Sequence, residues 1–311
     1  MINRDTVVCI ATYKRPAGLQ RCLESIGLLE TDRLLRVIVA DNDGGDAAGL
    51  SVCESLRTSG YPYAIASLKV TERGISHARN ALVREAIADP DVKFIAMIDD
   101  DEWPDEGWLQ SLLDVQANTG ADVVGGPVTR VFARPVPEYL ARANLADFST
   151  LKSGAVEFVD GTCNVLIKAD TFRAKQAPWF DPAFGLLGGE DTDFFVGLKV
   201  QGSRFAWAET ALVYEEMPAS RSSARWMLQR AYRIGNTYSL VNLKHRPPGF
   251  GIRSETVKIL GTVAVSAATI ALCFWHPARR FEATRLLARA MGKVAGFLGR
   301  RHAEYTVVHG G

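Results

Sequence analysis

The sequence has almost no excess of charge of either sign and few cysteines. Its 36 basic residues face 35 acidic ones, a formal net charge of +1, whereas nucleic-acid-binding domains are usually basic. We therefore expect no nucleic-acid partner. The five cysteines are odd in number and widely spaced, and none forms a CxxC pair. This pattern argues against a disulfide framework and a structural zinc site, and favours a reducing cytosol.

Other absences narrow the function classes. No Gly-x-Gly-x-x-Gly follows the first expected strand, which argues against a dinucleotide-dependent oxidoreductase. No Gly-rich, Arg-containing loop opens the chain, which disfavours a sugar-nucleotide pyrophosphorylase. We expect no signal peptide, because the first residues run almost at once into an apolar strand pattern. With 311 residues, 47% of them apolar, the chain is expected to form one large α/β domain with an appendage, or two fused halves.

Short apolar runs alternate with amphipathic stretches in the first third of the chain. The expected strands are 6–13, 35–42, 64–70 and 93–101, and the expected helices begin at Pro16 and span 75–88. Strands that alternate with helices predict a mainly parallel sheet. Ligands of such sheets gather at the carboxyl ends of the strands, where Thr12, Asp41 and Asp99 fall.

The middle of the chain has a mixed pattern. Strands are expected over 121–132 and 156–168, helices over 190–200 and 222–243, and a linker over 246–251. The predicted organisation has three parts. They are a first half (1–102), a second half of the same domain (103–245), and a linker with a helical tail (246–311).

Two groups of carboxylates stand at positions where chemistry is expected. Asp99, Asp100 and Asp101 end an apolar strand, and carboxylates this close repel one another unless a divalent cation offsets their charge. The alternative is a solvated acidic loop before a helix. Glu190 and Asp191 follow a glycine pair, in a first helical turn that favours negative charge. They suit either a general base or a plain helix start.

Six stretches, taken together, resemble the family 2 glycosyltransferases of the GT-A fold, above all those that build bacterial exopolysaccharides of the succinoglycan type. The stretches are 11–16 (ATYKRP), 39–42 (VADN), 74–80 (GISHARN), 98–101 (IDDD), 161–164 (GTCN) and 189–194 (GEDTDF). They fall roughly within 5–245 in the family's order and spacing. The resemblance implies an α/β, Rossmann-like GT-A fold with a mainly parallel central sheet flanked by helices. We expect a C-terminal helical appendage that associates with a membrane.

The resemblance also assigns a nucleotide-sugar site. It implies that 1–102 is a nucleotide-sugar-binding half and that 103–245 is an acceptor-binding and catalytic half of the same domain. The residues implied for it are Thr12, Asp41, Arg79, Asp99, Asp100, Gly161 and Asn164. Thr12 and Asp41 would line the nucleobase pocket, although Asp41 also suits a turn before two glycines. Arg79 would reach the nucleotide or its phosphates, with a helix-surface arginine as the alternative. Gly161 and Asn164 would lie near the donor sugar.

The implied reaction is an inverting transfer of one sugar from a nucleoside diphosphate sugar, with a UDP-sugar preferred. Asp101, with Asp99, would bind Mn²⁺ or Mg²⁺, which stabilises charge on the diphosphate leaving group. Asp191, with Glu190 beside it, would be the catalytic pair that deprotonates an acceptor hydroxyl. The acceptor is expected to be a glycan, lipid-linked in polysaccharide biosynthesis. The alternative is a catalytically silent sugar-nucleotide-binding scaffold of a membrane assembly complex.

The sequence departs from some members of the family. Processive synthases carry Gln-x-x-Arg-Trp, whereas here Arg221 precedes Arg225 and Trp226 with a longer gap, which favours single-sugar transfer. Glu215 stands where many members have a histidine. The side chains at 230 and 233, both arginine, suit either a phosphate contact or a solvated helix face.

The tail combines an apolar run with a basic helix. Residues 259–275 carry no charge, and 17 residues is the lower limit for spanning a bilayer; a buried helix is the alternative. Residues 276–301 have seven basic side chains and one acidic one, a net charge of +6. A basic amphipathic helix is typical of a membrane surface. We expect both flanks on the cytoplasmic face of a bacterial inner membrane, with 285–301 on anionic headgroups.

Overall fold

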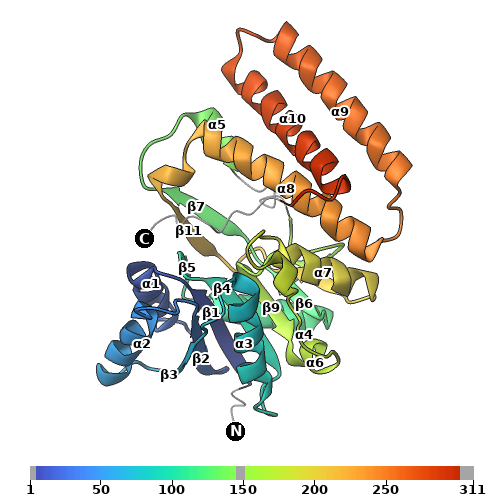
Figure 1. Ribbon diagram of the computed structural model, residues 1–311. Coiled ribbons are helices and arrows are strands. Elements are labelled where there is room, and N and C mark those ends of the chain that lie inside the picture. Colours follow the sequence, from blue (N-terminus) through green and yellow to red (C-terminus); the bar gives the residue numbers. More distant parts are fainter. Residues whose placement is uncertain (1–4, 145–150, 302–311) are drawn as a thin grey trace.

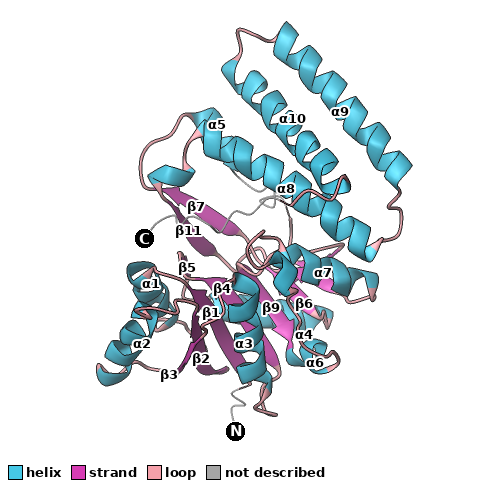
Figure 2. Cartoon of the chain, in the orientation of Figure 1, coloured by secondary structure: helices cyan, strands magenta, loops and turns pink. Residues whose placement is uncertain are grey.

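The computed structural model describes residues 5–144 and 151–301, in which helices flank a large sheet and a helical hairpin stands at the C-terminal end (Figures 1 and 2). The strands are β1 Thr6–Thr12, β2 Leu34–Asp41, β3 Ala64–Lys69, β4 Phe94–Asp99, β5 Glu102–Pro104, β6 Val123–Gly125, β7 Val128–Phe132, β8 Gly154–Val156, β9 Asn164–Lys168, β10 Phe205–Trp207 and β11 Val213–Met217. The helices are α1 Pro16–Ile26, α2 Ala48–Thr58, α3 Ile75–Ile87, α4 Trp108–Thr119, α5 Glu138–Asn144, α6 Ala169–Arg173, α7 Glu190–Val200, α8 Ala224–His245, α9 Ile252–Leu272 and α10 Pro277–Phe297, with short 3-10 helices η1 Pro182–Phe184 and η2 Ala219–Arg221.

The large sheet has the strand order β3-β2-β1-β4-β9-β6-β10-β8. As the alternation of strands and helices predicts, β3, β2, β1 and β4 run parallel. β9 is antiparallel to both of its neighbours, β4 and β6. The register sets Thr12 beside Asp41 and Ala11 beside Asp99. The carboxyl ends of β1, β2 and β4 therefore meet at one edge of the sheet, where the predicted ligand-binding side chains lie.

Two apolar layers hold this edge in position. Leu19 and Leu23 of α1 and Leu112 of α4 are buried against one face of the sheet. Leu82 of α3 and Phe195 of α7 are buried against the other face. Because both faces of the central strands are covered, β1 and β4 form near-continuous apolar runs, and only the ends of these two strands carry polar groups.

The single strand predicted over 121–132 is divided into β6 and β7, which enter different sheets. Gly126 lies at the break, and a Cβ on it would sit 2.7 Å from the Ala211 carbonyl oxygen. The chain turns there into a second, three-stranded sheet with the order β5-β11-β7. The run predicted over 156–168 is divided in the same way, because β8 ends at Val156 and β9 begins at Asn164.

The tail packs on the rest of the chain, through α10 against α8, rather than standing apart from it (Figure 1). A Cβ on Gly292 of α10 would lie 1.8 Å from the Tyr232 carbonyl oxygen, and one on Gly235 of α8 would lie 2.0 Å from the Arg289 carbonyl oxygen. The two helix backbones therefore touch at these glycines. Polar contacts add to this packing, since Ser239 donates to the Lys293 carbonyl at 2.9 Å.

This close packing predicts that Gly292→Ala destabilises the protein, although alanine favours helices. The added methyl group overlaps the backbone of α8, so we expect the free energy of unfolding to fall by about 1–3 kcal/mol. Gly261→Ala in α9 is the matched control, because nothing lies within 4 Å of its Cβ position, and helix propensity predicts a gain of up to about 1 kcal/mol. Denaturant unfolding measures both changes. Equal effects of the two substitutions would contradict the packing of α10 on α8.

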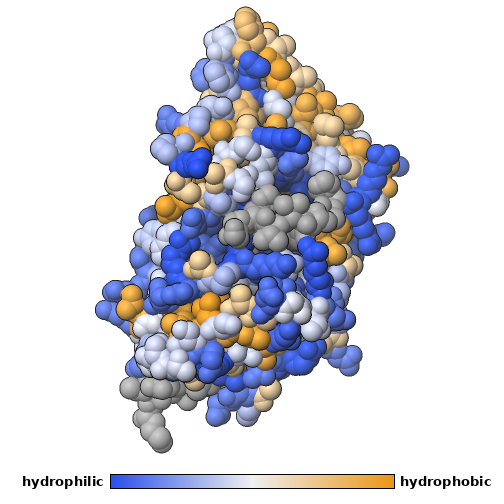
Figure 3. All heavy atoms as spheres, turned by 60° about the vertical axis from the view of Figure 1, so that its left-hand side comes forward, coloured by the Kyte–Doolittle hydropathy of each residue, from blue (hydrophilic) through white to orange (hydrophobic). Residues whose placement is uncertain are grey.

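α9 and the turn that follows it expose apolar side chains. Phe274 and Trp275 are 66% and 69% exposed, and the most apolar 18-residue stretch of α9 is only 17% buried. Hydrophobic colour gathers over this hairpin in Figure 3. By length and composition, α9 is the one helix in the described ranges that could cross a membrane. The exposure of its surface argues against the buried-core alternative.

Candidate active site

Asp100 joins the ends of β1 and β4. Its carboxylate accepts a hydrogen bond from the Thr12 hydroxyl at 2.8 Å and pairs with Arg15 at 3.0 Å. Burial raises the pKa of Asp100 to about 6, against the opposing effect of Arg15. Pro16 begins α1 directly after this arginine, so the turn between β1 and α1 delivers the guanidinium. Thr12 and Asp100, both predicted for the nucleotide-sugar site, are therefore in contact.

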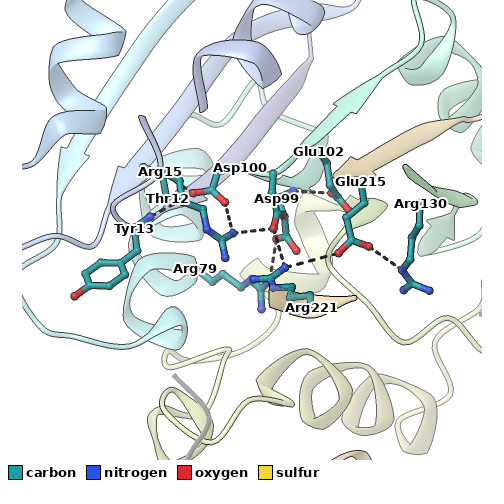
Figure 4. A network of polar contacts seen from close by, with 11 residues as sticks. Thr12, Tyr13, Arg15, Arg79, Asp99, Asp100, Glu102, Arg130, Glu215 and Arg221 are labelled. Carbon is teal, nitrogen blue, oxygen red and sulfur yellow. Dashed lines mark hydrogen bonds and ion pairs between the residues drawn. The ribbon is translucent and has the colours of Figure 1, made fainter. Parts of the chain in front are cut away.

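Asp101 receives two guanidinium groups from distant parts of the chain. Its Oδ2 lies 2.8 Å from Nη1 of Arg15 and 3.0 Å from Nη1 of Arg221. Arg221 ends η2, just before α8 begins. Figure 4 shows the guanidinium groups of Arg15, Arg79 and Arg221 converging on the carboxylates at the end of β4. The second half of the chain thus reaches the strand ends of the first.

Arg79 connects the end of β4 to the start of α7. Its guanidinium pairs with Glu190, and its Nη2 lies 3.2 Å from Oδ1 of Asp99. Arg79 and Glu190 are both buried, so Arg79 is not a helix-surface arginine. Burial raises the pKa of Glu190 to about 7, although Arg79 opposes that shift. The predicted nucleotide-binding residue Arg79 therefore links the two groups of carboxylates.

The turn before α7 needs its two glycines. Gly188 and Gly189 have positive φ values of 76° and 90°, and a Cβ on Gly189 would lie 2.1 Å from Cγ2 of Thr237 in α8. Asp191 follows in the first turn of α7, where its Oδ1 accepts from the backbone N–H of residue 192 at 2.7 Å. Unlike the buried Glu190, Asp191 is half-buried. Of the two predicted catalytic carboxylates, Asp191 is therefore the accessible one.

The small sheet places a third row of charged side chains beside the site. Glu102 of β5, Glu215 of β11 and Arg130 of β7 are neighbours in register. Arg130 Nε donates to Glu215 at 3.0 Å (Figure 4). Glu102 is buried and accepts from the Asp99 N–H at 2.9 Å. Its burial, together with Asp99 and Glu215, raises its pKa well above the usual range.

Some of the predicted site residues serve the architecture. Asp41 is buried, and its two carboxylate oxygens accept hydrogen bonds from the backbone N–H groups of Asp43 at 2.9 Å and Gly49 at 2.8 Å. Asp41 therefore stabilises the turn after β2, as its alternative interpretation predicted. Asn164 uses its side chain to bind the Pro127 and Ala211 carbonyls and Trp108 Nε1, so it holds two loops to α4. Gly161 lies in the loop before β9, where a Cβ would sit 3.2 Å from Cys163 Sγ.

Apart from Arg79, the arginines of the site were missed or left open by sequence reasoning. Arg15 stood in a recognised stretch without a role, Arg221 was weighed only as part of a motif, and Arg130 carried no signal. Each is a single basic residue in a loop or short strand, so periodicity could not mark it. Only Arg15 had a usable clue, since it lies between a strand end and the proline that opens a helix.

The residues at the end of β4 fit the implied divalent cation when substrate phosphates supply part of its ligands. Asp99 and Asp101 offer the carboxylate oxygens that Mg²⁺ and Mn²⁺ prefer, and such an ion needs only one or two of them when substrate phosphates supply other ligands. Within the described ranges, no group of three or more His, Cys, Asp or Glu side chains could hold a metal ion. The site therefore fits a cation that arrives with a diphosphate rather than an all-protein metal centre.

Comparisons with known sequences show which proteins this chain resembles. A model of glycosyl transferase family 2 matches residues 7–174. The succinoglycan biosynthesis protein ExoM of Rhizobium meliloti (strain 1021) is 35% identical over 97% of this chain and 95% of its own length. The pre-mycofactocin glycosyltransferase of Mycobacterium tuberculosis (strain ATCC 25618 / H37Rv) is 26% identical over 76% of this chain, and the match spans 48% of that relative.

Solved structures share the fold. The S. aureus TarS fragment 1–349 in complex with UDP superposes with a TM-score of 0.55 at 13% identity, covering 98% of this chain and 95% of the fragment. The mannosyltransferase PcManGT from Pyrobaculum calidifontis, in complex with GDP-Man and Mn²⁺, gives a TM-score of 0.61 at 16% identity, covering 95% and 88%. These likenesses confirm the predicted GT-A fold.

Proposed function

Since the chain belongs to glycosyl transferase family 2 and is a glycosyltransferase, we propose that it moves one sugar from a nucleoside diphosphate sugar to a hydroxyl group of a glycan acceptor, with inversion. The observation that carries this proposal is the connection Asp99–Arg79–Glu190. It sets an accessible carboxylate, Asp191, at a fixed position relative to the carboxylates at the end of β4.

In the proposed mechanism, the start of α7 supplies the base and the end of β4 holds the cation. Asp191 accepts the proton of the acceptor hydroxyl as that oxygen attacks the anomeric carbon. Direct displacement of the diphosphate on the opposite face inverts the configuration. Arg79 and Glu190 act as positioning residues, because they fix the first turn of α7 against β4. A base held by a buried ion pair keeps the orientation that efficient proton transfer needs.

Asp101 and Asp99 would hold Mn²⁺ or Mg²⁺. When bound, the cation offsets the charge that develops on the diphosphate leaving group. In the structure Asp101 pairs with Arg15 and Arg221, whose positive charge has the same sign as that of the cation. The two guanidinium groups are therefore placed to contact the diphosphate once it occupies the site.

The donor is proposed to be a UDP-sugar. TarS has been solved with UDP and with UDP-GlcNAc, whereas PcManGT has been solved with GDP-Man, so the fold accepts either base. Thermal shift of the full-length protein with uridine, guanosine and thymidine diphosphate sugars, with and without Mn²⁺, tests the proposal. One donor should raise the melting temperature only with the cation. A protein that none of them stabilises would contradict it.

The acceptor is proposed to be a lipid-linked glycan in bacterial polysaccharide biosynthesis. ExoM, at 35% identity over nearly the whole chain, is a succinoglycan biosynthesis protein, which supports this assignment. The exposed apolar hairpin of α9 and α10 supports a membrane-bound acceptor, because an apolar surface of this kind fits a lipid interface.

We place the protein at the cytoplasmic face of the membrane, lying on it through the α9–α10 hairpin. The basic side chains predicted to face the lipid headgroups form two groups: some pair with acidic residues, and others are exposed. Lys293 pairs with the buried Glu255 of α9 at 3.1 Å, and Arg285 pairs with Glu282 at 2.7 Å. Arg289 and Arg300 remain exposed. Apolar insertion therefore carries more of the proposed attachment than the basic face does.

Replacing both Phe274 and Trp275 by serine is expected to weaken binding to vesicles that contain phosphatidylglycerol. Each buried aromatic side chain contributes on the order of 2 kcal/mol, so the loss of both should lower partitioning by about 10²–10³-fold. Leu28→Ser is the matched control, because Leu28 is exposed and follows α1, which lies far from the hairpin (Figure 1). Vesicle flotation measures the effect. Unchanged flotation of the double variant, or cleavage near Arg300 by protease added outside spheroplasts, would contradict this placement.

A further inference from the structure

The first turn of α7, which carries Asp191, lies between two buried carboxylates. Glu190 stands one residue before Asp191 and pairs with Arg79 of α3. Asp193 stands two residues after Asp191 and is only 4% exposed. The Asp193 N–H closes the turn by donating to the Gly189 carbonyl at 2.9 Å. The turn therefore has one anchor on α3, and Asp193 is placed to provide a second.

Asp193 is held by the last turn of α8. Its Oδ1 lies 2.8 Å from His245 Nε2, and its Oδ2 accepts from Lys244 Nζ at 2.7 Å. The two helices lie side by side (Figure 1), and a Cβ on Gly197 of α7 would sit 3.0 Å from Cε1 of His245. A buried carboxylate paired in this way resists displacement, because breaking the pair leaves an uncompensated buried charge. We call Asp193, Lys244 and His245 the α7 anchor.

Lys244 also reaches the other end of the segment that contains Asp191. Its Nζ donates to Oδ2 of Asp181 at 2.8 Å, and Oδ1 of Asp181 caps η1 by accepting from the Ala183 N–H at 2.9 Å. Burial opposes the charge of Lys244, yet hydrogen bonds with Asp181 and Asp193 raise its pKa. One charged ammonium group therefore bridges positions 181 and 193.

The bridged segment has little stiffness of its own. It contains Gly185, Gly188 and Gly189, of which the last two have positive φ values, and glycine loses more conformational freedom on ordering than any other residue. Within the described residues, the carboxylate of Asp191 bonds only to groups of residue 192. The position of Asp191 therefore depends on what holds the ends of the segment.

We propose that Lys244, His245 and Asp193 act as positioning residues for the base, by holding the segment 181–193 against the end of α8. The inference rests on the proposed function, in which Asp191 takes the proton of the acceptor hydroxyl. Proton transfer depends on the distance and direction of the base. Release of the α7 anchor therefore slows the reaction of bound substrates and leaves donor binding unchanged.

Lys244→Met and Asp193→Asn test the α7 anchor, because each keeps most of the side-chain shape and removes one charge of the bridge. Full-length protein is assayed with the donor that the thermal-shift panel identifies, and membranes of the source organism supply the acceptor. Turnover at saturating donor should fall by about 10-fold or more in each variant, with the donor KM and the nucleotide affinity unchanged. The double variant should be no slower than the slower single variant, since both changes release the same anchor.

Hydrogen exchange shows whether the turn itself is released. The Asp193 N–H is protected by its bond to the Gly189 carbonyl, so peptides covering the first turn of α7 should exchange about 10-fold faster in Lys244→Met. His245→Ala should slow turnover in the same way. His245→Gln should recover part of the rate, because a glutamine amide can donate to Asp193 from the place of Nε2. A glutamine variant as slow as the alanine variant would contradict the role of this hydrogen bond.

Lys199→Met is the matched control. Lys199 stands in the last turn of the same helix and pairs at the surface with the exposed Glu157, so its loss should change neither turnover nor exchange. Unchanged turnover in Lys244→Met, with or without faster exchange, would overturn the inference, because the α7 anchor would then serve folding alone. Weaker nucleotide binding that accompanies the slower turnover would also overturn it. Failure of the proposed function is seen separately, when Asp191→Asn transfers sugar at the wild-type rate.

Discussion

Asp191→Asn is expected to lower turnover by about 10²-fold or more while leaving donor binding nearly intact. Asparagine keeps the size of the side chain and can still accept from the N–H of residue 192, which now bonds Oδ1 at 2.7 Å. The first turn of α7 should therefore hold its shape. What the substitution removes is basicity, and the attacking hydroxyl then has no group to take its proton. Single-turnover sugar transfer, compared with nucleotide affinity by calorimetry, separates the two effects.

Asp170→Asn provides the control for this prediction. Asp170 also stands in a first helical turn, in α6, and its side chain is exposed beside Arg173. It should transfer sugar at the wild-type rate. If Asp191→Asn also turns over at that rate, Asp191 only begins a helix. A variant that loses donor binding together with turnover would instead indicate damage to the link between α7 and β4.

The sequence was most informative where local chemistry and structure agree. The helix predicted over 190–200 has the bounds of α7, because a glycine pair permits the turn and carboxylates favour the first helical turn. The strand ends at Thr12 and Asp99 could be predicted because apolar runs stop there. The family assignment is confirmed, since the family model matches residues 7–174 and ExoM is 35% identical over 97% of this chain.

What could not be predicted depends on long-range contacts. Nothing in the pattern of 121–132 shows that Gly126 sends the chain into a second sheet, and that sheet brings Glu215 and Arg130 to the site. The side chain of Asn164 resembles a ligand in sequence but binds two carbonyls and Trp108. The tail was predicted as an appendage from its composition. Its glycines, which allow α10 to touch α8, have a meaning only in three dimensions.

Asp101 provides the other large expected effect, because its carboxylate balances two arginines and is placed to bind a cation. Asp101→Asn keeps the shape of the side chain and removes the negative charge between Arg15 and Arg221. Without that charge the site should lose its response to Mn²⁺. The loss of several kcal/mol of charge stabilisation predicts turnover lower by about 10²–10³-fold.

Nucleotide binding gives the sharper measurement for Asp101, since it needs no turnover. Wild-type protein should bind nucleoside diphosphate more weakly in EDTA than in Mn²⁺, and Asp101→Asn should bind it equally in both. The variant need not bind more weakly than the wild type in EDTA, because Arg15 and Arg221, released from Asp101, can contact the diphosphate directly. Asp114→Asn, at an exposed position of α4, should keep the wild-type difference. Equal wild-type affinity in EDTA and Mn²⁺ would refute a role for the cation in binding, and would leave the two arginines as the groups that hold the diphosphate.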